Sequence, residues 1–293
     1  MTLFALLIVM ALERVTSKSK TFHIGTLTQQ YFDWAGNKGF TTSDEKSDEK
    51  SDEKNDNQQT SDKPSYVSSL LLAGIPALLF VLLFAWLPLV FEFVVSLFVL
   101  WICLGCPITR NTYKQYLAAA NREDFQACVL HSMNFGNQGG ELSNVGKQLV
   151  LVNYRQYASV MLFFVLLGVP GLVFYSIIKE LSLQCKQKNN RVLDETPADK
   201  ILFALDWIPV RMTTLGFLIV GHFSNALTAW MHVVTEPKIN TYDALAKVSK
   251  AAEDVSNCDS HLSEPLQLVK LVKRNIVFVL MAVAVATMVG LVR

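Results

Sequence analysis

Residues 67–106 read VSSLLLAGIPALLFVLLFAWLPLVFEFVVSLFVLWICLGC, and Glu92 is the single charged residue among them. A helix that crosses the hydrocarbon core of a membrane needs about 20 apolar residues. The stretch is therefore long enough for two such helices, which would be joined near Pro88. We expect membrane spans at about 67–87 and 89–106.

The composition of the whole chain also indicates a membrane protein. Of its 293 residues, 51% are hydrophobic and 17% are charged, which is too apolar for an ordinary soluble domain. Two more spans are expected at about 158–178 and 275–292. Met212–Val234 is apolar too but carries two histidines, so it is either an extra span or an interfacial helix.

The predicted fold class is all-α, because no stretch shows the alternation of apolar and polar residues that is typical of strands. We expect a polytopic membrane protein with four to five transmembrane helices. Cytoplasmic amphipathic helices would accompany them, and Thr241–Val255 has the apolar spacing of one. Thr112–His131 also has helical spacing, with a break at Asn121–Asp124.

Three regions differ in composition. Residues 1–40 begin with the apolar run Leu3–Leu12, which is too short to span and lacks the flanks of a cleaved signal peptide. We expect an anchor followed by a short polar region. Residues 41–65 repeat Ser-Asp-Glu-Lys three times without a large apolar residue, which predicts a disordered linker. Residues 66–293 form the helical membrane domain.

The orientation of the spans depends on two basic clusters. Arg110 and Lys114 follow the second predicted span, and a second cluster precedes the last one, namely Lys270, Lys273 and Arg274. Loops rich in Lys and Arg are usually cytoplasmic. A single span between the clusters would place them on opposite sides. Either Met212–Val234 crosses or dips deeply, or one apolar segment is re-entrant, and we favour the first.

The motif Leu205–Arg211, LDWIPVR, places an acid, a proline and a guanidinium at the start of an apolar run. Pro209 suits the first turn of a helix, which would put Asp206 near the helix N-terminus. Charges at such an entry are unfavourable unless they are paired or bind something polar. The motif therefore predicts either an N-capping Asp206 with Arg211 as an interfacial anchor, or part of a ligand site.

Polar side chains occur at several predicted membrane boundaries. If the ends of these helices converge, they form one polar pocket, and its arginines could hold a phosphate or carboxylate with two hydrogen bonds. Anchoring at the interface explains the same residues equally well. The ligand-binding candidates are Glu13, Arg14, Asn153, Arg155, Asp206, Arg211 and His222.

Sequence signatures of several enzyme classes are missing. Gly146–Lys147 lacks the glycine and hydroxyl positions of a phosphate-binding loop, and no zinc-protease or serine-hydrolase signature occurs. Cys103 and Cys106 have no second pair to complete a zinc site, and the odd total of five cysteines argues against a disulfide framework. We expect no catalytic residue, metal, cofactor or nucleic-acid partner.

Several of these motifs together resemble the AmpE family of bacterial inner-membrane proteins. The matching residues are Met1–Phe4 with Glu13–Arg14, Asn153–Arg155, Leu205–Arg211, Gly221–His222 and Ala226–Trp230. The resemblance covers nearly the whole chain except the Ser-Asp-Glu-Lys repeats. It implies a multi-pass inner-membrane regulator that modulates induction of a chromosomal β-lactamase. It also implies a functional link to a cytosolic muropeptide amidase, with a muropeptide or nucleotide as the small ligand.

The AmpE family is similar in turn to the CobD/CbiB cobinamide-phosphate synthases, which form an amide bond at the expense of ATP. Those enzymes carry acidic motifs before and after the third span, whereas this chain has Val152–Arg155 and Lys179–Leu183 there. Such chemistry needs carboxylates that hold Mg²⁺ against phosphate. The resemblance therefore implies a non-enzymatic modulator, with a membrane-bound ATP-dependent ligase or transferase as the alternative. A transporter is disfavoured, since no inverted repeat is visible.

Overall fold

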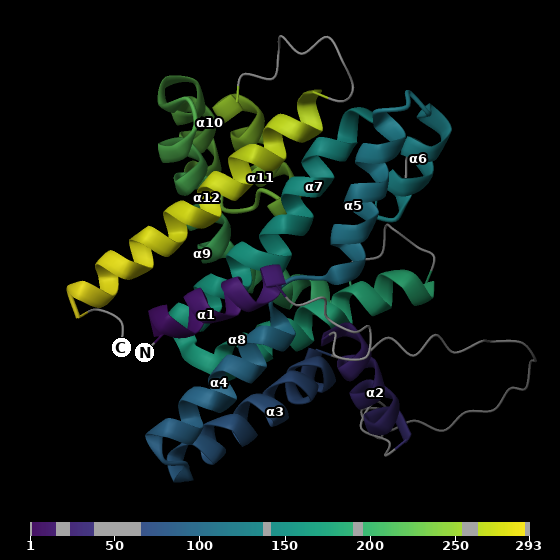
Figure 1. Cartoon of the computed structure of the whole chain (residues 1–293). Helices are drawn as coiled ribbons and strands as arrows, with labels where there is room; N and C mark the ends of the chain where they lie inside the picture. The colour runs from purple at the N-terminus through teal and green to yellow at the C-terminus, as the bar shows by residue number, and fades with distance from the viewer. Residues whose placement is uncertain are drawn as a thin grey trace, which may run out of the picture.

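The computed structural model describes residues 2–15, 24–37, 66–136, 142–189, 196–253 and 263–290, and these form helices and turns without a strand. The predicted all-α class is confirmed, whereas the predicted linker at 41–65 lies outside the described residues. The helices are α1 (Thr2–Val15), α2 (Ile24–Asn37), α3 (Tyr66–Trp86), α4 (Leu89–Cys103), α5 (Pro107–Ala120), α6 (Phe125–Met133), α7 (Val145–Asn153), α8 (Ser159–Asn189), α9 (Pro197–Val220), α10 (Phe223–Thr235), α11 (Thr241–Glu253) and α12 (Ser263–Met288), with a short 3₁₀ turn at Leu142–Asn144 and a π-helical segment, η3 (Tyr154–Ala158) (Figure 1).

Within the described ranges, four helical stretches are long and apolar enough to cross a membrane. They are Ser69–Trp86, Val90–Ala120, Val145–Gln184 and Pro197–Val220, and α1 is a shorter apolar helix. The first two correspond to the predicted pair, with the turn at Leu87–Pro88. The predicted span at 275–292 falls on α12, which is not one of the four.

The predicted span at 158–178 is not one straight helix. The rings of Phe163 and Tyr175 stack with centroids 4.3 Å apart, whereas twelve residues of straight helix rise about 18 Å. The chain reverses at Gly168, which has φ +69° and ψ −159°, so α8 consists of two arms that fold back on each other. Glycine tolerates this positive φ, and Pro170 suits the first turn of the second arm. A hydropathy average over the stretch detects neither the glycine nor the proline.

Helix α9 begins earlier than the sequence indicated. Thr196 is its N-cap, and Thr196 and Asp199 exchange the reciprocal hydrogen bonds of a capping box. The predicted helix start near Pro209 is therefore wrong: Pro209 and Asp206 lie in the interior of α9. Proline is tolerated there within a packed helical core.

Met212–Val234 does not form one helix either, because α9 ends at Val220 and α10 starts at Phe223. A Cβ on Gly221 would lie 2.7 Å from both the Cβ and the carbonyl oxygen of Ala252. The main-chain N–H of His222 donates to that same oxygen at 2.8 Å. The close approach of α11 thus interrupts the apolar run.

Two further predicted helical stretches are present in the structure. Helix α5 ends at Ala120, and Asp124 caps α6 by accepting a hydrogen bond from the N–H of Ala127. Helix α11 occupies the predicted amphipathic stretch and packs on α7, α9 and α10. Figure 1 shows α5, α6, α7, α10 and α11 in the upper part of the molecule, and α3 and α4 below them.

The lower part presents an apolar surface. Leu78, Leu79 and Leu82 on α3 are each more than half exposed, and so are Val90 and Phe91 on α4. Exposed aliphatic side chains in a continuous belt are typical of contact with lipid rather than water. The chain is a multi-pass helical membrane protein.

Candidate functional site

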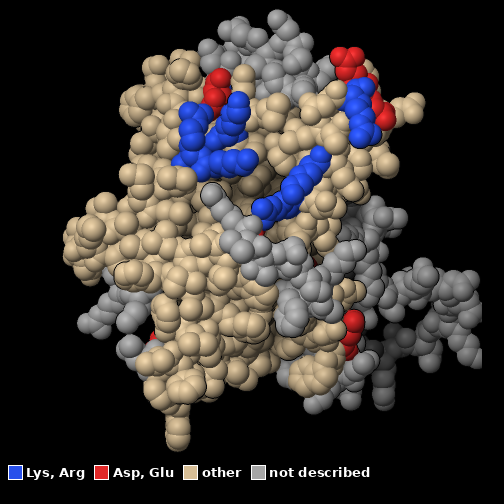
Figure 2. Space-filling view, in the orientation of Figure 1, with Lys and Arg blue, Asp and Glu red and all other residues tan. Residues whose placement is uncertain are grey.

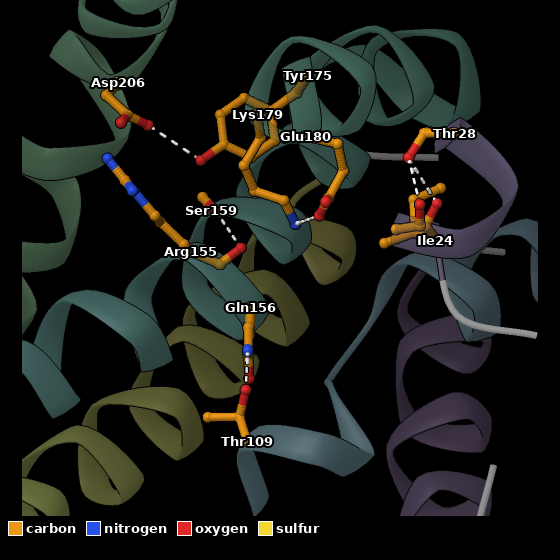
Figure 3. Close-up of polar contacts among 11 residues, drawn as sticks. Ile24, Thr28, Thr109, Arg155, Gln156, Ser159, Tyr175, Lys179, Glu180 and Asp206 are labelled. Atoms are coloured by element: carbon orange, nitrogen blue, oxygen red, sulfur yellow. Dashed lines mark hydrogen bonds and ion pairs between the residues drawn. The ribbon is translucent and has the colours of Figure 1, made fainter. Parts of the chain in front are cut away.

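A buried carboxylate lies where the two arms of α8 meet α9. The Asp206 side chain is 1% exposed, and two tyrosine hydroxyls donate to its Oδ1 atom. The donor atoms are Tyr154 Oη at 2.8 Å and Tyr175 Oη at 3.1 Å. Tyr154 belongs to η3, ahead of the first arm. Tyr175 belongs to the second arm, and Figure 3 shows its hydrogen bond to Asp206. One carboxylate oxygen therefore joins three helical segments.

The register of the second arm against α9 explains how Asp206 reaches Tyr175. A second hydrogen bond joins the same two helices, from Ser182 Oγ to Asp199 Oδ1 at 2.5 Å. Tyr175 and Ser182 are seven residues apart, and so are Asp206 and Asp199 in the opposite direction. Seven residues make about two helical turns. Both acids thus lie on the same face of α9, and antiparallel packing brings each to a hydroxyl of α8.

Basic side chains lie close to this carboxylate. Figure 3 shows Arg155, from η3, extended toward Asp206. Lys179, one turn after Tyr175, is buried and pairs with Glu180 at 3.7 Å. π-Helical turns are rare and occur frequently at functional sites. Here the turn places the adjacent residues Tyr154 and Arg155 beside the same acid.

Three buried polar atoms on η3, α8 and α9 have no hydrogen-bond partner within the described residues. They are Arg155 Nε, Ser176 Oγ and Thr213 Oγ1. Ser176 is adjacent to Tyr175, and Thr213 follows Asp206 by about two helical turns on α9. Most buried polar atoms in proteins are hydrogen-bonded, so unpaired ones require an explanation. We define the Asp206 site as Asp206, Tyr154, Tyr175 and Arg155.

Glu13 belongs to a different group of contacts, at the end of α1. Tyr157 Oη donates to Glu13 Oε1 at 2.6 Å, and Arg110 forms an ion pair with the same carboxylate at 3.7 Å. Gly105 has φ +72°, and a Cβ on it would lie 2.6 Å from Glu13 Oε1. These contacts fasten α1 to the α4–α5 junction. The side chain of the candidate Arg14 lies outside the described residues.

Arg211 belongs to a third group. Its guanidinium lies 4.1 Å from the centroid of the Trp207 ring and donates to the carbonyl oxygens of Val233 and Glu236 at 3.2 and 3.3 Å. Arg211 therefore stabilises the C-terminal end of α10, where a cation is favourable. Five residues turn an α-helix by about 140°, so Asp206 and Arg211 point in different directions. Asp206 and Arg211 therefore do not lie in one pocket, contrary to the pocket hypothesis from the sequence.

The other two candidates also lie apart from Asp206. Asn153 Nδ2 donates to the carbonyl oxygen of Leu149 within α7, at 2.8 Å. His222 is exposed at the start of α10. Sequence reasoning missed Tyr154 and Tyr175, although Tyr154 lies between two candidates. Their shared role depends on the reversal at Gly168, which gives no periodic signal.

Comparison with known proteins identifies the family. The family model described as "Regulatory signalling modulator protein AmpE" matches residues 54–292. Protein AmpE from Shigella flexneri is 24% identical over 203 residues, which cover 64% of this chain and 71% of that protein. No solved structure matches. The family match covers most of the chain, which therefore belongs to the AmpE family of regulatory signalling modulators.

Proposed function

We propose that this protein is a non-enzymatic modulator in the bacterial inner membrane, linked to cell-wall recycling and β-lactamase induction. Its ligand would be a small anionic molecule, a muropeptide or a nucleotide, bound at the Asp206 site. The observation that carries the proposal is the buried carboxylate of Asp206 beside Arg155, whose buried Nε atom has no hydrogen-bond partner within the described residues. Ionisable groups inside a membrane protein are functional candidates by default.

The chemistry of the site favours an anionic ligand with hydroxyl or amide groups. Arg155 presents a planar guanidinium that can hold a phosphate or carboxylate with two hydrogen bonds. The carboxylate of Asp206 can accept from a ligand O–H or N–H. The carboxylate of Asp206 lies beside Arg155 and can balance its charge.

The same geometry suggests how binding could be transmitted. Tyr154 of η3 and Tyr175 of the second arm of α8 are held together through one oxygen of Asp206. A ligand that competes for Arg155 or Asp206 changes the contacts between the arms and α9. Ligand binding shifts a conformational equilibrium only through such differential contacts. A modulator needs no further chemistry than this.

The experiment is a thermal-shift titration of the detergent-purified full-length protein with muropeptides and with ATP plus Mg²⁺. Wild type is compared with Arg155→Gln and with Arg122→Gln, which removes an exposed arginine outside the site. We expect one ligand to raise Tm in wild type and in Arg122→Gln, and to have no effect on Arg155→Gln. A hundredfold excess over Kd should stabilise the protein by about 2.7 kcal/mol.

ADP release in the same samples separates the two classes of function. A modulator that only binds gives a Tm shift without turnover. Turnover that depends on Mg²⁺ would contradict the proposal and favour the ligase alternative. An absence of shift with every probe would contradict the ligand site itself.

A further inference from the structure

One exposed face of α12 changes from basic to apolar along its length. Its first half carries three exposed cations, Lys270, Lys273 and Arg274. Its second half exposes aliphatic side chains, with Val277 52% and Met281 63% exposed. The face as a whole consists of Lys270, Lys273, Arg274, Val277, Met281, Val285 and Met288, which we call the α12 stripe.

The α12 stripe is continuous along the helix. Steps of three and four residues lead from Lys270 through Arg274 to Met288, and such steps keep side chains on one face of a helix. The opposite face is buried against the rest of the protein, with Leu268, Leu271 and Val272 at 3% exposure or less. The change from charge to hydrocarbon occurs between Arg274 and Val277, over a rise of about 4.5 Å.

Among the described residues, two of the three cations have no acidic partner. Arg274 forms an ion pair with Glu253, and nearby Lys250 pairs with Glu264 at 2.8 Å. Within the described residues, neither Lys270 nor Lys273 has an acidic side chain within ion-pair distance. Two unpaired ammonium groups thus lie immediately above an exposed apolar surface.

A second basic segment lies in the same upper part of the molecule. Lys114 is exposed on α5, which follows directly after α4. Figure 2 shows Lys and Arg side chains gathered in the upper half of this face, while the lower half is almost free of charge. Both basic segments adjoin apolar helix in the sequence, since α5 follows α4 and the basic half of α12 precedes its apolar half, and basic residues beside apolar helices are typical of a membrane surface.

We propose that the α12 stripe binds anionic phospholipid, with Lys270 and Lys273 on the headgroup phosphate and Val277, Met281 and Val285 against the acyl chains. Charge complementarity selects this partner, because a zwitterionic headgroup offers no net charge to two unpaired lysines. The long aliphatic stems of lysine allow the ammonium groups to reach the headgroup while the stems stay on apolar surface. This inference is independent of the Asp206 site.

The test measures lipid binding to the full-length protein in detergent by native mass spectrometry. The probes are phosphatidylglycerol, phosphatidylcholine and free glycerol phosphate. The variant Lys270→Gln/Lys273→Gln is compared with Lys238→Gln/Lys247→Gln, which removes the same charge from exposed positions on and beside α11. Tm without lipid establishes that both variants fold.

We expect phosphatidylglycerol to bind wild type and the α11 variant equally and the α12 variant about 30-fold more weakly. Raising the salt concentration should reduce this difference, since exposed charges are screened. Equal affinity for phosphatidylcholine and phosphatidylglycerol would overturn the proposal. So would an equal loss in both variants, or binding of glycerol phosphate as tight as that of the lipid.

Discussion

Tyr154 and Tyr175 donate hydrogen bonds to the same oxygen of Asp206, although 21 positions separate them in the sequence. In one straight helix their Cα atoms would be about 31 Å apart. The shared acceptor therefore requires the reversal of α8 at Gly168. Because both arms depend on one buried carboxylate, the site and the fold of the membrane domain are energetically connected.

The first prediction concerns the hydroxyl of Tyr175. Tyr175→Phe keeps the ring that stacks on Phe163 but leaves Asp206 with Tyr154 as its remaining tyrosine donor. Loss of a hydrogen bond to a buried charged group should reduce the free energy of unfolding by about 1.5–3 kcal/mol. Denaturant titration in detergent checks this, with Tyr113→Phe on α5 as the control. Equal stability of both variants would contradict the role of Tyr175.

The second prediction tests the reversal of α8. Gly168→Ala should reduce the free energy of unfolding by about 1–3 kcal/mol, because the combination of φ +69° and ψ −159° is unfavourable for a residue with a Cβ. The nearest atom to that Cβ is Pro170 Cδ at 3.8 Å, so the loss would come from the backbone and not from a clash. Gly74→Ala, which meets no atom within 4 Å in α3, should be neutral or stabilising. Equal effects of both substitutions on unfolding would argue against a reversal.

The third prediction concerns the contact between α9 and α12. A Cβ on Gly216 would lie 2.0 Å from Asn275 Oδ1, so in Gly216→Ala the Asn275 side chain must shift within the contact between the two helices. We expect a loss of about 1–3 kcal/mol in stability. Asn275→Ala removes a buried amide that has no hydrogen-bond partner within the described residues. The double variant should therefore be more stable than Gly216→Ala alone, and strict additivity in this cycle would refute direct contact.

The fourth prediction concerns Cys128 on α6. Burial, and to a smaller extent the charge of Asp124, raise the pKa of the Cys128 thiol above its ordinary value of 9.0. The thiolate is the reactive form, so maleimide labelling of a single-cysteine Cys128 protein should be slow at neutral pH and accelerate only at alkaline pH. The unfolded thiol loses its proton first as pH rises through 9.0. Below pH 9.0, burial of the neutral thiol therefore contributes fully to the free energy of unfolding. This contribution decreases above pH 9.0 and is lost as the pH rises through the higher pKa of the native thiol. Rapid labelling of the folded protein at pH 7 would contradict the burial.

The sequence predicted those features that depend on local composition. Forty apolar residues around Pro88 indicate α3 and α4, and the polar tetrad 121–124 separates α5 from α6. Asp206 and Arg155 were both identified as candidates, because charged residues beside apolar runs are conspicuous. The family resemblance was visible in the same residues and is confirmed by the family match.

Other features depend on contacts between distant segments. A single glycine reverses α8, yet hydropathy averages over it. Arg211 looked like a partner of Asp206, but the pitch of α9 directs it to the end of α10. The orientation of the spans depends on the number of crossings between the two basic clusters. The re-entrant alternative requires a reversal such as the one at Gly168, whereas the other alternative requires a crossing such as α9 could provide.

The most direct test of the proposed role measures β-lactamase induction in cells that lack their own copy of the gene. Such cells would carry wild type, Arg155→Gln, Asp206→Asn or the control Arg122→Gln, each at equal membrane abundance. Our account predicts that Arg155→Gln and Asp206→Asn behave like the strain without the protein, while Arg122→Gln behaves like wild type. Normal induction in both site variants would contradict a regulatory role for the Asp206 site.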